Sequence, residues 1–174
     1  MERTYWFDRK FNFDGAENSF SETLGRLSKT PIRLTDLVRT IPEEWLTLRL
    51  DGKWSIKENI GHLTDLEPLW QQRLKDIISG APEMHEADLS NTKTNEANHN
   101  SKHISELLNE FETLRNQTLS MLEEIDEEIK AKSSLHPRLK TPMRTTDLFL
   151  FVAEHDEHHL ETISLIAERL FSIV

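Results

Sequence analysis

The sequence has 174 residues, a formal net charge of −10 and no cysteine. Its length predicts one domain with a single hydrophobic core. The negative charge disfavours a nucleic-acid partner, and the absence of cysteine excludes disulfides, thiolate metal sites and a cysteine nucleophile.

Two further features of the composition bear on location and fold class. The longest apolar run, LFLFVA, is far too short to span a membrane, and the opening MERTYWFDRK lacks the apolar core of a signal peptide. We therefore expect a soluble, cytoplasmic protein with no membrane partner. Five glycines and six prolines leave few tight turns for an all-β fold, which favours an all-α protein.

The first 18 residues are predicted to form an N-terminal arm, and residues 19–174 the domain itself. We expect the aromatic rings of the arm to pack on the domain surface or across a dimer contact; they are Tyr5, Trp6, Phe7, Phe11 and Phe13. A first helix is predicted from residue 19 or 21 to residue 39, with a kink or an interruption at Pro31.

A second helix is predicted to begin after Ser55, because Ser55 and Glu58 have the spacing of a capping box. Its apolar residues recur every three or four positions until Ser79 and Gly80 end it. Residues 80–100 show no such pattern and are predicted to form a long structureless link.

The third helix is predicted from Ser101 to about Ile129, and the segment HPRLKTPMR that follows is predicted to be a loop. A fourth helix is expected from Thr145 or Thr146 to about Phe171. Four long amphipathic helices predict a four-helix bundle. The long connection between helices two and three allows these two helices to run parallel.

The segment EHDEHHLETI, residues 154–163, contains three histidines within the fourth helix. Successive helical residues rotate by about 100°, so His155 and His159 lie one turn apart on the apolar stripe and His158 lies at its margin. The acids of the segment are predicted to face solvent; they are Asp156, Glu157 and Glu161.

Two histidines four residues apart on one helical face can bind one metal ion. His62 of the second helix also faces the bundle and supplies a third candidate ligand. A single inward histidine is usually a core residue with its hydrogen bonds satisfied. Burying three near one another costs more, and a shared metal ion would remove that cost. Geometry alone leaves a metal site and three packed core histidines equally open.

Two motifs resemble the DinB family, which includes bacillithiol S-transferases and a mycothiol-dependent maleylpyruvate isomerase. They are WSIKENIGHLTDLE, residues 54–67, and HDEHHLETI, residues 155–163. The resemblance implies a four-helix bundle that binds a divalent metal through His62, His155 and His159. Glu161 and Thr162 replace the glycine and glutamine usual after the paired histidines, which weakens any transfer of substrate preference.

Other polar residues are weaker candidates. Glu58 could support a ligand or act as a base, although its capping role already explains it, and His158 could hold a neighbouring ring. The remaining histidines are predicted to face solvent or to lie in a turn; they are His85, His99, His103 and, in the turn, His136. Arg73 is predicted to form a salt bridge at the surface.

The favoured hypothesis is a metal-dependent enzyme of the thiol S-transferase or hydrolase type. Imidazole ligands suit zinc or nickel, with iron or manganese as alternatives. The expected partners are a small-molecule substrate, a low-molecular-weight thiol and a second copy in a homodimer. The alternative hypothesis is a non-catalytic helical interaction protein whose histidines are structural.

Overall fold

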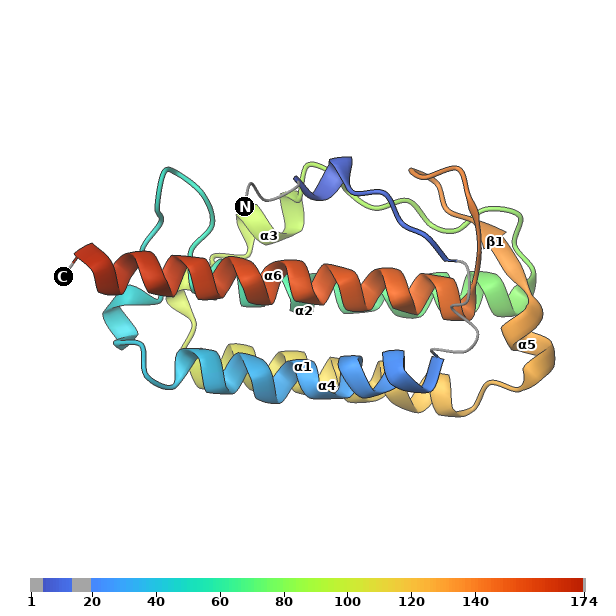
Figure 1. The fold of residues 1–174 in the computed structure, drawn as a ribbon, viewed down its shortest axis with the longest axis horizontal. Helices are drawn as coiled ribbons and strands as arrows, with labels where there is room; N and C mark the ends of the chain where they lie inside the picture. The colour runs from blue at the N-terminus through green and yellow to red at the C-terminus, as the bar shows by residue number, and fades with distance from the viewer. Residues whose placement is uncertain (1–4, 14–19, 174) are drawn as a thin grey trace.

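The structure is a computed structural model that describes residues 5–13 and 20–173. Its four long helices are α1 (Phe20–Val38), α2 (Ile56–Ser79), α4 (Ile104–Glu123) and α6 (Thr145–Ile173) (Figure 1). The shorter elements are η1 (Trp6–Asp8), η3 (Glu43–Trp45), α3 (Thr92–Glu96), η4 (His99–Ser101), α5 (Glu127–Ala131), β1 (Ser133–Leu135) and β2 (Pro142–Arg144). The predicted boundary of the arm at residue 18 lies outside the described residues.

The long helices form a four-helix bundle, which confirms the predicted fold class. The colours in Figure 1 show α1 and α6 running in one direction and α2 and α4 in the other. The α2 helix contacts α4 and α6, and α1 contacts the same two helices. The long connection thus joins two parallel neighbours, α2 and α4.

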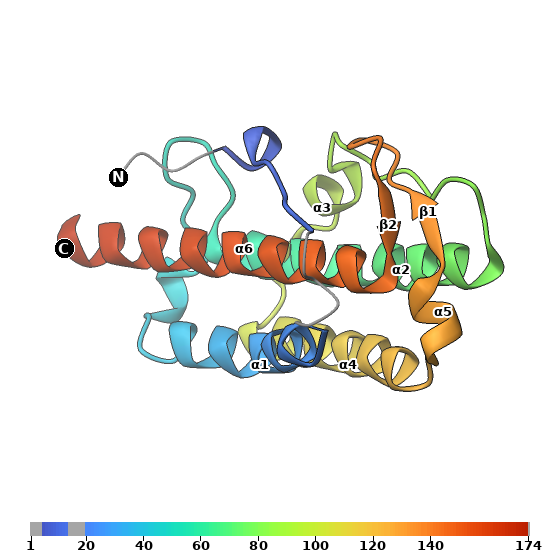
Figure 2. The ribbon, with the colours of Figure 1, turned by 45° about the vertical axis from the view of Figure 1, so that its right-hand side comes forward.

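Several of the shorter segments lie on one face of the bundle, over α2 and α6. Figure 2 shows η1, α3 and the β1–β2 hairpin on this face. The hairpin occupies the predicted loop, where Ser134 pairs with Met143 in an antiparallel register. Met143 is fully buried, so the hairpin is anchored to the core. These segments give the bundle one covered face on which a site can be built.

The helix bounds agree with the prediction in part. The α1 helix continues through Pro31 without the predicted interruption, and the capping box of Ser55 and Glu58 begins α2 as predicted. Side-chain caps change the bounds of the third predicted helix. The third long helix begins later than expected, since the His103 side chain accepts a hydrogen bond from the backbone of Ser105. Asp126 caps a separate short helix, α5.

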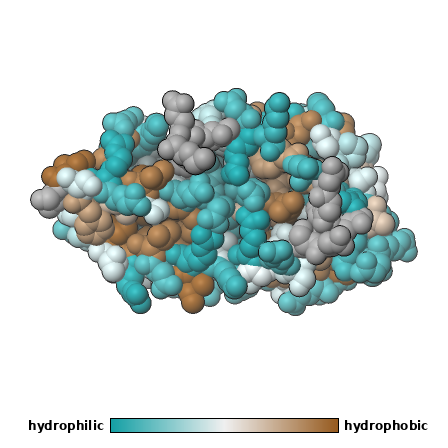
Figure 3. All heavy atoms as spheres, viewed as in Figure 1, coloured by the Kyte–Doolittle hydropathy of each residue, from teal (hydrophilic) through white to brown (hydrophobic). Residues whose placement is uncertain are grey.

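The hydrophobic core has two clusters of buried residues. One includes Leu27, Leu74 and Phe149, and the other includes Leu34, Ile60 and Phe111. On the face in Figure 3, hydrophilic residues predominate in the middle, and hydrophobic ones gather where α6 ends. Among the described helices, none has both the length and the apolar character that a membrane span requires.

A buried ionic layer crosses the bundle. Arg115 of α4 donates to Asp156 of α6 from Nη1 (2.5 Å) and to Glu67 of α2 from Nη2 (2.6 Å). Thr30 and Thr118 donate to the same two carboxylates. The prediction that Asp156 faces solvent is wrong, because the side of α6 away from the histidines packs against other helices.

Candidate metal centre

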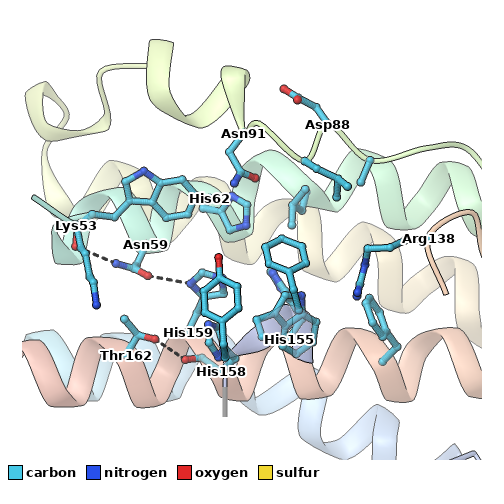
Figure 4. Close-up of a pocket in the computed structure, with 18 of the residues that line it drawn as sticks. Lys53, Asn59, His62, Asp88, Asn91, Arg138, His155, His158, His159 and Thr162 are labelled. Carbon is cyan, nitrogen blue, oxygen red and sulfur yellow. Dashed lines mark hydrogen bonds between the residues drawn. The ribbon is translucent and has the colours of Figure 1, made fainter. Parts of the chain in front are cut away.

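The structure brings the three predicted histidines together. His62 comes from α2, and His155 and His159 come from successive turns of α6 (Figure 4). One ring nitrogen from each lies within 4.8 Å of the others. The ring centroids are 4.6 Å apart for His155 and His159, and 4.9 Å apart for His62 and His159. All three side chains are buried.

A hydrogen-bond chain sets the orientation of His62. The Thr94 hydroxyl donates its single proton to Asp65 Oδ2 at 2.9 Å, because a carboxylate can only accept. Thr94 Oγ1 also lies 3.1 Å from His62 Nδ1, and with its proton used it must accept there. The His62 proton is therefore on Nδ1. The lone pair of Nε2 is left for a ligand in the cluster.

The same Asp65 carboxylate holds a second buried histidine, His99, at 2.8 Å from its Nε2. The His99 ring packs on Gly61 of α2, and a Cβ added at Gly61 would lie 2.3 Å from two ring atoms. This glycine is thus required for the link to approach α2 closely. The contact places Thr94 beside His62.

Asn59 sets the orientation of His159 by a similar argument. Its amide nitrogen donates to the Ser55 carbonyl at 2.8 Å, which assigns the other atom as Oδ1. That oxygen lies 2.9 Å from His159 Nδ1 and accepts the ring proton. The lone pair of His159 therefore belongs to Nε2. The third ring, His155, has a buried Nδ1 with no hydrogen-bond partner among the described residues.

Burial favours the neutral form of two of these rings, His62 and His155. It lowers the pKa of His62 to about 4, partly opposed by the nearby Asp65 carboxylate. Burial also lowers the pKa of His155 well below the ordinary histidine value, and the neighbouring His62, His158 and Arg115 add to the effect. Neutral imidazole is the form that binds metal. The donor set, its held tautomers and its unpartnered nitrogen therefore fit a divalent ion.

The histidines form part of the wall of a cavity of about 700 Å³. Aromatic residues line much of the rest, including Trp54, Trp70 and Phe151. Trp6 from the arm packs edge-on against His155 with centroids 5.0 Å apart, and the Arg9–Glu154 ion pair (2.8 Å) ties the arm to α6. The centre is thus enclosed by the arm on one side and open to the cavity on the other.

Glu58 and His158 were the two residues predicted to support the site, and the structure places only His158 beside the histidines. Both Glu58 carboxylate oxygens are engaged by Arg49, and one also accepts the Ser55 backbone N–H, so Glu58 contacts none of the three histidines through a hydrogen bond. The His158 ring lines the cavity, 5.2 Å from His159 and 5.4 Å from Trp6.

Two other predictions are corrected. His99 does not face solvent but is 3% exposed, because the gap at Gly61 accommodates its ring. His136 lies at the start of a turn, in line with the prediction, and its ring is buried with Nε2 3.0 Å from Arg73 Nη1. Arg73 is 2% exposed rather than at the surface. His85 and His103 are exposed as predicted.

Sequence reasoning did not identify Asn59, Thr94 or Asp65 as partners of the centre. Asn59 and Asp65 both lie within three residues of His62, so helical spacing could have indicated them. Thr94 carries no such signal, because only the fold of the link brings it there.

The comparisons with known proteins concern the family and the fold of the chain. The family model described as the DinB superfamily matches residues 26–163. The chain belongs to the DinB superfamily. No curated protein gives a match. A solved structure with similar architecture is YfiT from Bacillus subtilis, described as a probable metal-dependent hydrolase with an unusual four-helix bundle topology. It is 19% identical, the match covers 93% of each chain, and the TM-score is 0.79, so the likeness shows a shared fold.

Proposed function

We propose that this DinB-superfamily protein is a metal-dependent enzyme that acts on small molecules through His62, His155 and His159. The convergence of three buried imidazoles in the wall of a cavity carries the proposal. The description of YfiT as a probable metal-dependent hydrolase is consistent with it.

Three nitrogen ligands leave at least one coordination position for a reactant, which is typical of a catalytic rather than a structural site. A divalent ion held there would acidify a coordinated water or thiol and so supply a nucleophile near neutral pH. We propose zinc or nickel as the ion, with iron or manganese as alternatives, since neutral imidazole suits all four.

The protein's own residues hold and shield this centre. Thr94 and Asn59 fix the proton positions on His62 and His159 by accepting from Nδ1. Trp6 and Trp54 pack against the imidazoles, with centroids 5.0 Å from His155 and 4.7 Å from His62, and limit the access of bulk water. The aromatic cavity next to them would bind the apolar part of a substrate.

The nucleophile distinguishes two reactions, hydrolysis with water and S-transfer with a low-molecular-weight thiol. The test compares metal-loaded wild type, the metal-free protein and His62→Ala with ester and amide substrates and, separately, with several thiols and a model electrophile. We expect turnover that requires the metal and that His62→Ala abolishes. Equal turnover by the metal-free protein would contradict the proposal.

A control variant is His103→Asn, which retains a capping side chain at an exposed position outside the cluster. Turnover by this variant should equal that of wild type.

Homodimer formation and a cytoplasmic location also stay predictions. The interaction-protein alternative gains if a fully metal-loaded sample turns over none of these substrates.

A further inference from the structure

We propose that Arg73 and Arg138 form an oxyanion subsite at one end of the cavity, which binds a carboxylate or phosphate group of the substrate. The inference rests on the proposed function, because it names the chemical class of molecule that the three histidines would act on. Figure 4 shows Arg138 beyond His155, on the side away from His159.

Within the part of the chain that the structure describes, the guanidinium group of Arg138 has no anionic partner. It lies in the turn after β1, and its guanidinium carbon lies 5.2 Å from the centroid of the Phe7 ring. Its Nη2 is buried and has no hydrogen-bond partner among the described residues. Burial lowers the pKa of Arg138. A buried donor left unpaired costs free energy, and an oxyanion would satisfy it.

Arg73 supplies a second cation at the same end. Its Nε donates to the His85 carbonyl at 2.9 Å, and its guanidinium packs on Trp70 at 5.4 Å. Burial lowers the pKa of Arg73 to about 10, with Asp76 opposing and Arg138 adding to the effect, so the group is charged at neutral pH. The Asp76 oxygens accept from His85 and Gln72 rather than from Arg73.

His136 shows that donors outnumber acceptors here. The Arg73 guanidinium points at its Nε2 (3.0 Å), and the Leu139 backbone N–H points at its Nδ1 (3.2 Å). Burial and the two arginines lower the pKa of His136 to about 3, so the ring is neutral. A neutral imidazole has one acceptor nitrogen, and it cannot satisfy both donors. Counting the described residues, this end of the cavity therefore has one hydrogen-bond acceptor too few.

The acids that line the cavity do not fill this role. Asp88 accepts hydrogen bonds from Ser90 and Thr92, and Figure 4 shows its carboxylate pointing away from Arg138. Glu86 is exposed and forms no hydrogen bond or ion pair with either arginine. Two arginines that donate a hydrogen bond to no carboxylate of residues 5–13 and 20–173 are unusual in a chain of net charge −10 and favour an anionic ligand.

The cavity wall between the arginines and the histidines is aromatic, with Trp70 and Phe151 within ring contact of His155 or of each other. An aryl-substituted oxyanion therefore suits both parts of the cavity. Suitable probes are phenylacetate, phenyl phosphate and the neutral analogue phenylacetamide.

The experiment measures the binding of each probe by isothermal titration calorimetry, with metal-loaded and with chelated protein. Chelation removes the metal as an alternative anion site. We expect at least one of the two anions to bind roughly tenfold more tightly than phenylacetamide. Arg138→Gln should abolish this preference, and Arg138→Lys should retain part of it. The matched control is Arg169→Gln, because Arg169 lines the same cavity but is paired with Asp51 (2.8 Å).

The order of the two anions would assign the subsite to carboxylate or phosphate. Equal affinity for charged and neutral probes, or a preference that survives in Arg138→Gln, would overturn the proposal. Metal content is measured in the same samples. A wild type that binds metal but shows no anion preference overturns the subsite alone, and a wild type that shows the preference but binds no metal overturns the metal centre alone.

Discussion

Acidification should destabilise the metal-free protein through its buried histidines. The pKa of His62 is lowered to about 4 and that of His136 to about 3, and that of His155 is also well below the ordinary value. The unfolded chain therefore binds more protons than the folded one below pH 6.5, the reference histidine pKa. The stability from these neutral rings is present above that pH and is lost as pH falls toward the folded-state pKa values.

The size of this loss of stability follows from the difference between the histidine pKa values in the unfolded and the folded protein. Each ring that stays neutral at pH 5 while its unfolded counterpart is protonated lowers the free energy of unfolding by about 2 kcal/mol. Three such rings, His62, His136 and His155, lower it by roughly 6 kcal/mol, comparable with the 5–15 kcal/mol total stability of a typical domain. The metal-free protein should therefore be close to unfolding at pH 5.

The assay is urea denaturation of chelated protein at pH 7, 6 and 5, monitored by circular dichroism. His62→Gln removes one of the three titrating rings and should reduce the pH dependence of stability by about 2 kcal/mol between pH 7 and 5. The exposed control His103→Asn should keep the wild-type dependence. Equal stability of wild type at pH 7 and 5, or equal pH dependence of the two variants, would refute the reasoning.

Three further predictions concern the supports of the centre. Thr94→Val removes the acceptor of the His62 Nδ1 proton and should weaken zinc binding by about 10–100-fold, measured by competition with a chromogenic chelator; unchanged affinity would count against the hydrogen-bond chain. Arg115→Leu leaves Glu67 and Asp156 buried without their cation and should lower the free energy of unfolding by about 3–5 kcal/mol in urea denaturation, whereas a loss below about 1 kcal/mol would contradict the role of the layer. Zinc at about 100-fold excess over its Kd should stabilise wild type by roughly 2.7 kcal/mol but should leave the denaturation of His159→Ala unchanged.

Local periodicity was sufficient to predict the bundle and the inward orientation of His62, His155 and His159, while the family resemblance implied that the three share one site. Residues four apart on a helix must share a face, and the apolar stripe shows which face is inward. The same reasoning was wrong for Asp156. A residue on the side of α6 away from the histidines can still face another helix of the bundle. Its partner Arg115 lies 41 positions away in the sequence.

Apart from Asn59 and Asp65, the supporting contacts of the site depend on packing between distant segments, which local patterns do not encode. The burial of His99 depends on the missing side chain at Gly61, and this contact carries Thr94 to His62. Arg73 and His136 are 63 positions apart and become buried only because the hairpin covers α2. A polar residue in a link or on a helix edge therefore had no local signal of burial.

The most direct test of the metal centre is elemental analysis of protein purified without an affinity tag and without added metal. The wild type is expected to contain about one zinc, nickel, iron or manganese ion per chain. Each of the variants His62→Ala, His155→Ala and His159→Ala should contain little or none, and His103→Asn should match the wild type. A wild type that contains no metal and binds none of the four ions on titration would contradict the account, as would equal metal content in all the variants.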